Sequence, residues 1–168
     1  GYKVEDISSG IDETAERQPI GVFAAITPFN FPNMVPLWFL PTAITTGNTF
    51  IVKPSPQTPI SMDILFELLD ELDLPEGVVN LVHGGIESST AVMEHPDIVG
   101  VSFVGSTPVA KIVYETCAKH GKRVQAQGGA KNYIAVMPDA DMAASVANIM
   151  GSAFGCAGQR CLAGSVVV

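Results

Sequence analysis

The feature that most constrains the fold is a regular alternation between short apolar runs and longer amphipathic stretches. Apolar runs typical of buried strands cover residues 20–26, 48–53, 77–82 and 98–104, with shorter candidate runs at 123–126 and 133–137. Apolar residues recur at helical spacing within residues 60–72, 109–117 and 146–153. Strands that alternate with helices form parallel sheets with right-handed crossovers. The sequence therefore predicts an α/β fold built on a parallel sheet.

Three segments fit this alternation less well. Residues 1–18 are polar and lack clear periodicity, so we expect a lead-in segment, either a strand with a loop or a linker. Residues 33–46 predict only a weak helix, because Pro36 and Pro41 interrupt it. The sequence begins without methionine and ends on Ser165-Val166-Val167-Val168, which resembles an unfinished strand, so we expect a fragment of a longer protein.

Composition excludes several classes of function. The net charge is -8 with no basic patch, which argues against nucleic-acid or anionic-membrane partners. No apolar run is long enough to span a bilayer, and the first residues do not resemble a signal peptide. Three cysteines, an odd number, argue against a disulfide scaffold and for a reducing compartment. We therefore expect a cytoplasmic protein, or a mitochondrial matrix protein in a eukaryote.

Cys161 is the strongest candidate for a catalytic residue. It lies in a loop of small residues directly after Arg160, and a nucleophilic thiolate needs such room and local positive charge. The alternative is a buried structural cysteine. Cys156 and Cys161 are spaced as C-x4-C, but no second Cys/His pair lies at ligand spacing, so we expect no metal site.

Three further residues follow predicted strands, at the edge where parallel sheets place ligands. The Asn30 amide is a suitable donor to an oxyanion, or Asn30 is a turn residue before a helix. Lys53 can contact ribose hydroxyls or a phosphate, or it belongs to a solvated loop. Ser106 opens a helix and forms either an anion site or a simple N-cap. The dinucleotide fingerprint G-x-G-x-x-G is absent.

Taken together, these segments resemble the aldehyde dehydrogenase superfamily over about residues 19–168. The matching motifs, in order, are T-P-F-N-F-P, K-P-S, F-V-G-S-T, G-G-A-K-N, M-P-D-A-D and G-Q-R-C. The resemblance implies a Rossmann-like NAD-binding domain at residues 19–138. It also implies the start of a catalytic domain, with the nucleophile loop, at residues 139–168. The full-length protein is then expected to be a homodimer or homotetramer.

The resemblance also implies roles for individual residues. Cys161 corresponds to the nucleophile and Asn30 to the oxyanion donor. The expected NAD contacts are Thr27, Phe29, Lys53, Ser106, Gln127 and Gly128. In the family's K-P-S-E pattern the acid holds the adenosine ribose. Pro56 stands at that position here, so the choice between NAD and NADP stays open.

Within the superfamily, residues 129–132 and the pair Arg160-Cys161 resemble the coenzyme A-acylating branch that acts on methylmalonate semialdehyde. The Arg160 guanidinium can hold the carboxylate of a semialdehyde acid, or it pairs with an acid elsewhere. Hydrolytic members carry a glutamate where this chain has Gln127, and glutamine cannot act as a base. We therefore expect transfer of the acyl group to coenzyme A, unless a carboxylate outside the chain activates water.

The resulting hypothesis is NAD-dependent oxidation of malonate or methylmalonate semialdehyde through a Cys161 thioester. Two alternatives remain. The first is a hydrolytic aldehyde dehydrogenase with a different substrate range. The second is a nucleotide-binding fragment without activity.

Overall fold

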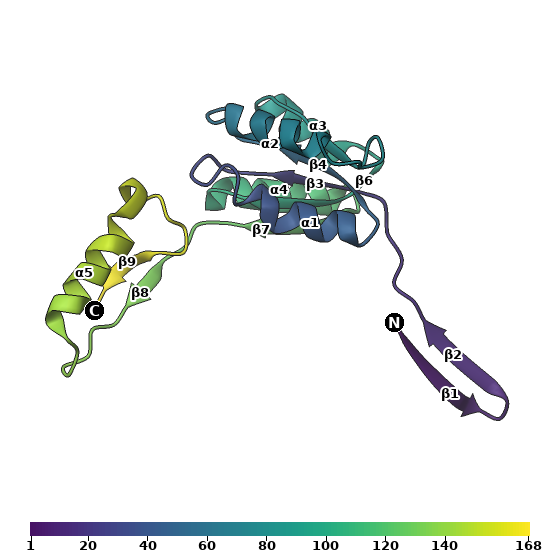
Figure 1. Ribbon diagram of the computed structural model, residues 1–168, viewed down its shortest axis with the longest axis horizontal. Helices are drawn as coiled ribbons and strands as arrows, with labels where there is room; N and C mark the ends of the chain where they lie inside the picture. The colour runs from purple at the N-terminus through teal and green to yellow at the C-terminus, as the bar shows by residue number, and fades with distance from the viewer.

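The computed structural model describes residues 1–168, and a parallel sheet forms its centre (Figure 1). The strand order is β5-β4-β3-β6-β7, and each neighbouring pair is parallel. The strands are β3 (Val22–Ile26), β4 (Thr49–Lys53), β5 (Val79–Leu81), β6 (Ile98–Val104) and β7 (Arg123–Gln127). Each lies within or overlaps an apolar run of the sequence, so the predicted parallel α/β sheet is confirmed.

Helices cover both faces of this sheet. They are α1 (Pro36–Thr45), α2 (Ile60–Asp70), α3 (Ile86–Glu94) and α4 (Thr107–Lys119). Successive strand residues point to opposite faces, and β3 shows this clearly. Ala24 and Ile26 pack in one apolar cluster with residues of α3 and α4. Ala25 packs in a second cluster with residues of α1 and α2. The core therefore consists of two layers separated by the sheet.

One helix was missed by the sequence analysis, and another forms where only a weak helix was expected. Helix α3 was not predicted, because its first turns are Ile86-Glu87-Ser88-Ser89-Thr90 and its buried residues, Val92 and Met93, come only at its end. Helix α1 forms despite two prolines. Pro36 occupies the first turn, where its missing N–H costs nothing, and burial of Leu40 offsets the bond lost at Pro41.

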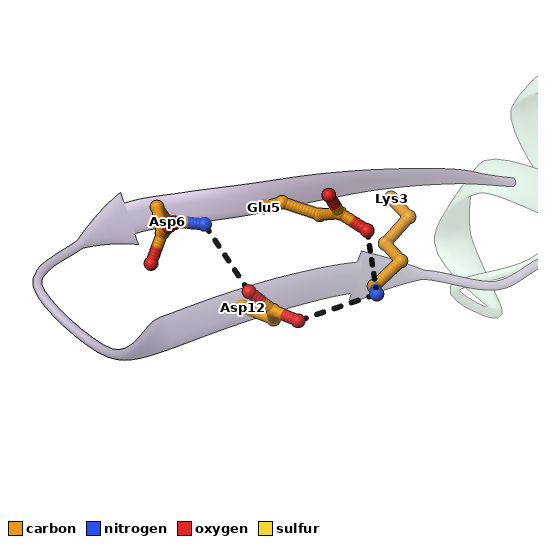
Figure 2. Close-up of polar contacts among 4 residues, drawn as sticks. All are labelled: Lys3, Glu5, Asp6 and Asp12. Atoms are coloured by element: carbon orange, nitrogen blue, oxygen red, sulfur yellow. Dashed lines mark hydrogen bonds and ion pairs between the residues drawn. The ribbon is translucent and has the colours of Figure 1, made fainter.

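Residues 1–18 contain an antiparallel hairpin, β1 (Tyr2–Ser8) with β2 (Ile11–Ala15), which extends away from the sheet (Figure 1). Figure 2 shows its polar contacts: Lys3 Nζ lies 3.1 Å from Glu5 Oε1 and 3.2 Å from Asp12 Oδ2. The Asp6 amide donates to Asp12 Oδ1 at 3.1 Å, in the part of the hairpin where the pairing register of β1 and β2 shifts. These groups are exposed, so each contact contributes little to stability.

The C-terminal part lies on the other side of the sheet from the hairpin (Figure 1). It comprises β8 (Asn132–Ile134), α5 (Met142–Ala153), a 3-10 turn η1 (Gly155–Gly158) and β9 (Gly164–Val167). The Asp141 side chain caps α5 by accepting from the Ala144 amide at 3.0 Å. Strand β8 pairs with β9 in a separate sheet. The domain boundary expected at residue 138 stays a prediction, but β8 belongs structurally to the part that follows.

None of the helices is both long enough and apolar enough to cross a membrane.

Asn48 fixes the entry into β3, and its replacement by alanine is expected to destabilise the protein. Its Oδ1 accepts from the Ile20 amide at 2.7 Å and from the Gly21 amide at 3.2 Å. Losing the Oδ1 acceptor of both hydrogen bonds should cost about 1–3 kcal/mol and lower the Tm of the full-length protein by several degrees. The control is Asn80→Ala, which removes one exposed bond, to the Gly77 carbonyl. An equal Tm shift in both variants would contradict this role of Asn48.

Candidate functional site

The strand order reverses between β3 and β6, and ligands of parallel sheets bind in the crevice beyond such a point. A cavity of about 600 Å³ lies there. It is lined by segments that follow three strands, residues 28–30 after β3, 104–106 at the end of β6 and 128–130 after β7. Residues 158–161 and 163–165 close its other side. The topology therefore brings the predicted ligand-binding loops and the predicted nucleophile loop to one place.

Asn30 and Cys161 line this same cavity. The Asn30 side chain donates from Nδ2 to the Gln159 carbonyl oxygen at 2.6 Å, a contact between residues 129 positions apart. A carboxamide nitrogen carries two N–H groups, so the second one remains available to a bound ligand. The cavity is therefore lined by the Cys161 thiol and by a neutral donor, the Asn30 amide. The loop that carries Cys161 holds this amide in place through the Gln159 carbonyl.

A second asparagine, Asn132, fixes the loop that carries Cys161. Asn132 Nδ2 donates to the carbonyl oxygens of Cys161 and Ala163, both at 2.9 Å. Nearby, the Gly129 amide donates to Thr107 Oγ1 at 2.8 Å, which ties the exit of β7 to the start of α4. Sequence reasoning did not assign a role to Asn132 or Thr107. Both lie inside recognised motifs, but the sequence does not reveal their partners.

The three cysteines have different environments. Cys117 lies in the core on α4, where burial raises the pKa of its thiol, an effect partly opposed by Lys122. Cys156 is exposed and adopts a left-handed backbone, φ 53°, and its sulfur accepts from Arg160 Nε at 3.4 Å. Cys161 is half-buried and is the cysteine that lines the crevice. Cys161 is therefore the thiol best placed to meet a ligand.

Cys161 also borders a second cavity of about 630 Å³, which is largely apolar and includes Phe31, Met34 and Leu162. Arg160 lines both cavities beside Cys161. The guanidinium is oriented by the Gly151 carbonyl, which accepts from Nη1 at 3.2 Å. None of the ion pairs in the structure involves Arg160. The guanidinium therefore retains donors for an incoming anion.

The edge of the sheet carries polar groups that fit a nucleotide. The Thr27 hydroxyl is buried without a hydrogen-bond partner, directly after β3. Beside it, Lys53 ends β4, and its carbonyl accepts from the Thr27 amide at 3.1 Å. The Lys53 side chain is buried and forms no ion pair, and this burial lowers its pKa. Phe29 and the helix-starting Ser106 line the crevice. A hydroxyl without a partner and an unpaired cation suit ribose and phosphate groups.

Not all predicted site residues meet in the crevice. Neither Lys53 nor Thr27 is among the residues that line it, and both are buried. Gln127 lines a separate cavity of about 470 Å³ beside α1, together with Trp38 and Phe39. Its carbonyl oxygen accepts from the Gly105 amide at 3.0 Å, and the next residue, Gly128, lines the crevice.

Comparisons with known proteins point to one protein family. A sequence profile described as the aldehyde dehydrogenase family matches residues 2–168. The chain is 56% identical to malonate-semialdehyde dehydrogenase 2 of Geobacillus thermodenitrificans, over all of this chain and 35% of that protein. It is 53% identical to malonate-semialdehyde dehydrogenase of Halalkalibacterium halodurans, with the same coverage. The chain thus spans about a third of the length of these relatives.

Solved structures also match the chain over nearly its whole length. The methylmalonate-semialdehyde dehydrogenase of Oceanimonas doudoroffii superposes with a TM-score of 0.97 at 50% identity, over 99% of this chain and 34% of that one. A structure described as a methylmalonate-semialdehyde dehydrogenase of Sinorhizobium meliloti complexed with NAD gives 0.96 at 48% identity, with the same coverage. At this similarity, the fold around the crevice is shared with those structures.

Proposed function

The chain belongs to the aldehyde dehydrogenase family, and on that premise we propose that the protein oxidises a semialdehyde with NAD through a thioester on Cys161. The observation that carries the proposal is the hydrogen bond from Asn30 Nδ2 to the Gln159 carbonyl. It holds a carboxamide donor at the cavity that Cys161 lines. Attack of a thiolate on a carbonyl needs these two groups together.

In the proposed first step, the Cys161 thiolate forms a bond to the aldehyde carbon, and the carbonyl π electrons move to oxygen. The oxyanion accepts a hydrogen bond from the second N–H of Asn30, because the first already binds Gln159. Asn132 holds the loop that carries Cys161 through the carbonyls of Cys161 and Ala163. Asn30 thus acts on developing charge, where a fixed donor contributes most.

The crevice is the proposed cofactor side, since Phe29, Ser106 and Gly128 line it, and the buried Thr27 and Lys53 lie at the ends of the neighbouring strands β3 and β4. A bound nicotinamide supplies a hydride acceptor to the reaction. The apolar cavity on the other side of Cys161 is the proposed entry for the aldehyde. Because both cavities are lined by Cys161, the two reactants can approach this residue from different directions.

For the substrate, we propose malonate semialdehyde or its methyl derivative. Arg160 lines both cavities beside the nucleophile and has no carboxylate partner within the chain. A guanidinium in this position suits the carboxylate of a short semialdehyde acid. The curated relatives named above are malonate-semialdehyde dehydrogenases, which agrees with this choice.

Coenzyme A is the proposed acyl acceptor. Gln127 cannot remove a proton from water, and its side chain lines the cavity beside α1 instead of the crevice. A thiol is a good nucleophile without such a base. The test supplies the full-length protein with NAD and malonate semialdehyde, with and without coenzyme A, and identifies products by mass spectrometry. An acyl-coenzyme A product is expected. Free acid as the sole product would instead indicate a hydrolytic enzyme.

Replacing Arg160 by methionine is expected to impair selectivity for acids. Loss of a charge-assisted contact should raise KM for malonate semialdehyde by about 10–100-fold. Propanal, which lacks the carboxylate, serves as the control substrate on the same variant. Because Arg160 also contacts Gly151 and Cys156, a structural role would impair both substrates equally, and that outcome would reject carboxylate binding.

A further inference from the structure

Gly151 is the one glycine inside an α-helix of this chain, and it lies near the end of α5. Glycine disfavours a helix more than any residue except proline. The backbone does not require glycine here, because φ at Gly151 is not positive. Space does not require it either, since a Cβ atom at Gly151 would meet no atom within 4 Å beyond its own helical turns. Neither the backbone nor the packing of the chain therefore accounts for the missing side chain.

Two nearby glycines differ from Gly151 in this respect. A Cβ atom at Gly155 would lie 2.8 Å from Arg160 Cζ, so Gly155 leaves room for the guanidinium. A Cβ atom at Gly164 would collide with the side chain of Ile134. The missing side chains of Gly155 and Gly164 are thus explained by contacts within the chain, and that of Gly151 needs another reason.

The side of α5 that carries Gly151 faces the apolar cavity of about 630 Å³ that Cys161 borders. Four residues of α5 line this cavity, and their spacing puts them on one side of the helix: Ala147, Asn148, Gly151 and Ser152. A side chain at position 151 would therefore project into the cavity that is the proposed entry for the aldehyde.

Gly151 also contacts the group that is proposed to bind the substrate carboxylate. Its carbonyl oxygen accepts from Arg160 Nη1 at 3.2 Å, so the guanidinium lies against this turn of the helix. Cys161 follows Arg160 in the sequence and lines the same cavity. In a malonate semialdehyde, one carbon separates the aldehyde from the carboxylate, and this carbon carries any substituent. With the aldehyde at Cys161 and the carboxylate at Arg160, the substituent lies in the cavity that Gly151 lines.

We propose that Gly151 is a specificity-determining residue, because its missing side chain leaves room for a substituent on the carbon between the aldehyde and the carboxylate. This inference rests on the proposed function, since it assumes that a semialdehyde acid binds between Cys161 and Arg160. A methyl group at position 151 would take up the space that a methyl group of the substrate needs. Gly151 therefore decides whether the protein accepts the methyl derivative or only malonate semialdehyde itself.

The first variant is Gly151→Ala in the full-length protein, with kcat/KM measured for malonate semialdehyde and for its methyl derivative. We expect kcat/KM for the methyl derivative to fall by about tenfold or more relative to that for malonate semialdehyde, the effect of one methyl group in an apolar pocket. Alanine favours a helix more than glycine does, so the Tm should not fall. A loss of selectivity without a loss of stability separates this role from a structural one.

A second pair of variants separates bulk in the cavity from bulk on the helix. Gly151→Val narrows the cavity further and is expected to lower kcat/KM for both semialdehydes by at least about tenfold. Ala144→Val is the matched control, because Ala144 is an exposed residue of the same helix and lines neither cavity that Cys161 borders. Both kcat/KM values should stay within about threefold of the original in this control.

Three results would overturn the inference and leave the proposed function intact. The first is an unchanged selectivity ratio in Gly151→Ala, and the second is a lower Tm with equal losses on both semialdehydes. The third is an original protein that oxidises malonate semialdehyde but not its methyl derivative. If the original protein oxidises neither semialdehyde, the proposed function fails and the inference fails with it.

Discussion

Replacing Cys161 by alanine is expected to lower kcat by at least about 10⁴-fold, because the proposed thioester cannot form without its sulfur. Binding of the nicotinamide cofactor should be retained, since the proposed contacts at Phe29, Ser106 and Lys53 are unchanged. The measurement pairs the rate of reduced nicotinamide formation with a calorimetric dissociation constant. Together they separate loss of chemistry from loss of folding.

Cys156→Ala is the matched control for that variant. Cys156 lies five residues before Cys161, is exposed and does not line the crevice. We expect its removal to change kcat by less than about threefold, as for an exposed side chain outside the site. Comparable losses in the two variants would mean that the loop needs both thiols for its shape, and they would count against Cys161 as the nucleophile.

Asn30→Ala is expected to lower kcat by about 10²–10³-fold with a small change in KM, the pattern for loss of an oxyanion donor. Asn30 also anchors the nucleophile loop through Gln159, so a second variant must isolate that contribution. Asn132→Ala serves this purpose, because Asn132 holds the same loop by the Cys161 and Ala163 carbonyls.

The Asn132 variant is expected to lose about tenfold in kcat, since a looser loop impairs positioning without removing a donor to the oxyanion. If its loss equals that of Asn30→Ala, then Asn30 is only a loop anchor. Steady-state kinetics of both variants on one aldehyde, with matched Tm values, provide the comparison.

The sequence predicts the sheet well for a physical reason. The central strands β3, β4 and β6 of the sheet are largely buried, with helices on both faces, so each appears as a mostly continuous apolar run. Helix α3 lacks that signal because only its last turn is buried. The hairpin of residues 2–15 also lacks an apolar run. Almost every residue in it is exposed, so no buried face imposes an alternation of apolar and polar residues.

The site is predictable only in part. Asn30 and Cys161 are recognisable by motif, but their shared cavity depends on a contact across 129 positions. The bonds from Asn132 depend on the pairing of β8 with β9, which no local pattern encodes. Gln127 and Gly128 are adjacent in the sequence but line different cavities. Strand alternation places Gln127 on the α1 side and the next residue in the crevice.

The proposed reaction passes through a covalent acyl group on Cys161. Peptide mass spectrometry of the full-length protein tests for this group most directly. The enzyme is quenched during turnover of malonate semialdehyde with NAD in the absence of coenzyme A. Under these conditions, slow attack by water should let the thioester accumulate. An acyl adduct is expected on the peptide that contains Cys161, and it should disappear when coenzyme A is added. Turnover with no adduct, or an adduct confined to Cys156, would contradict it.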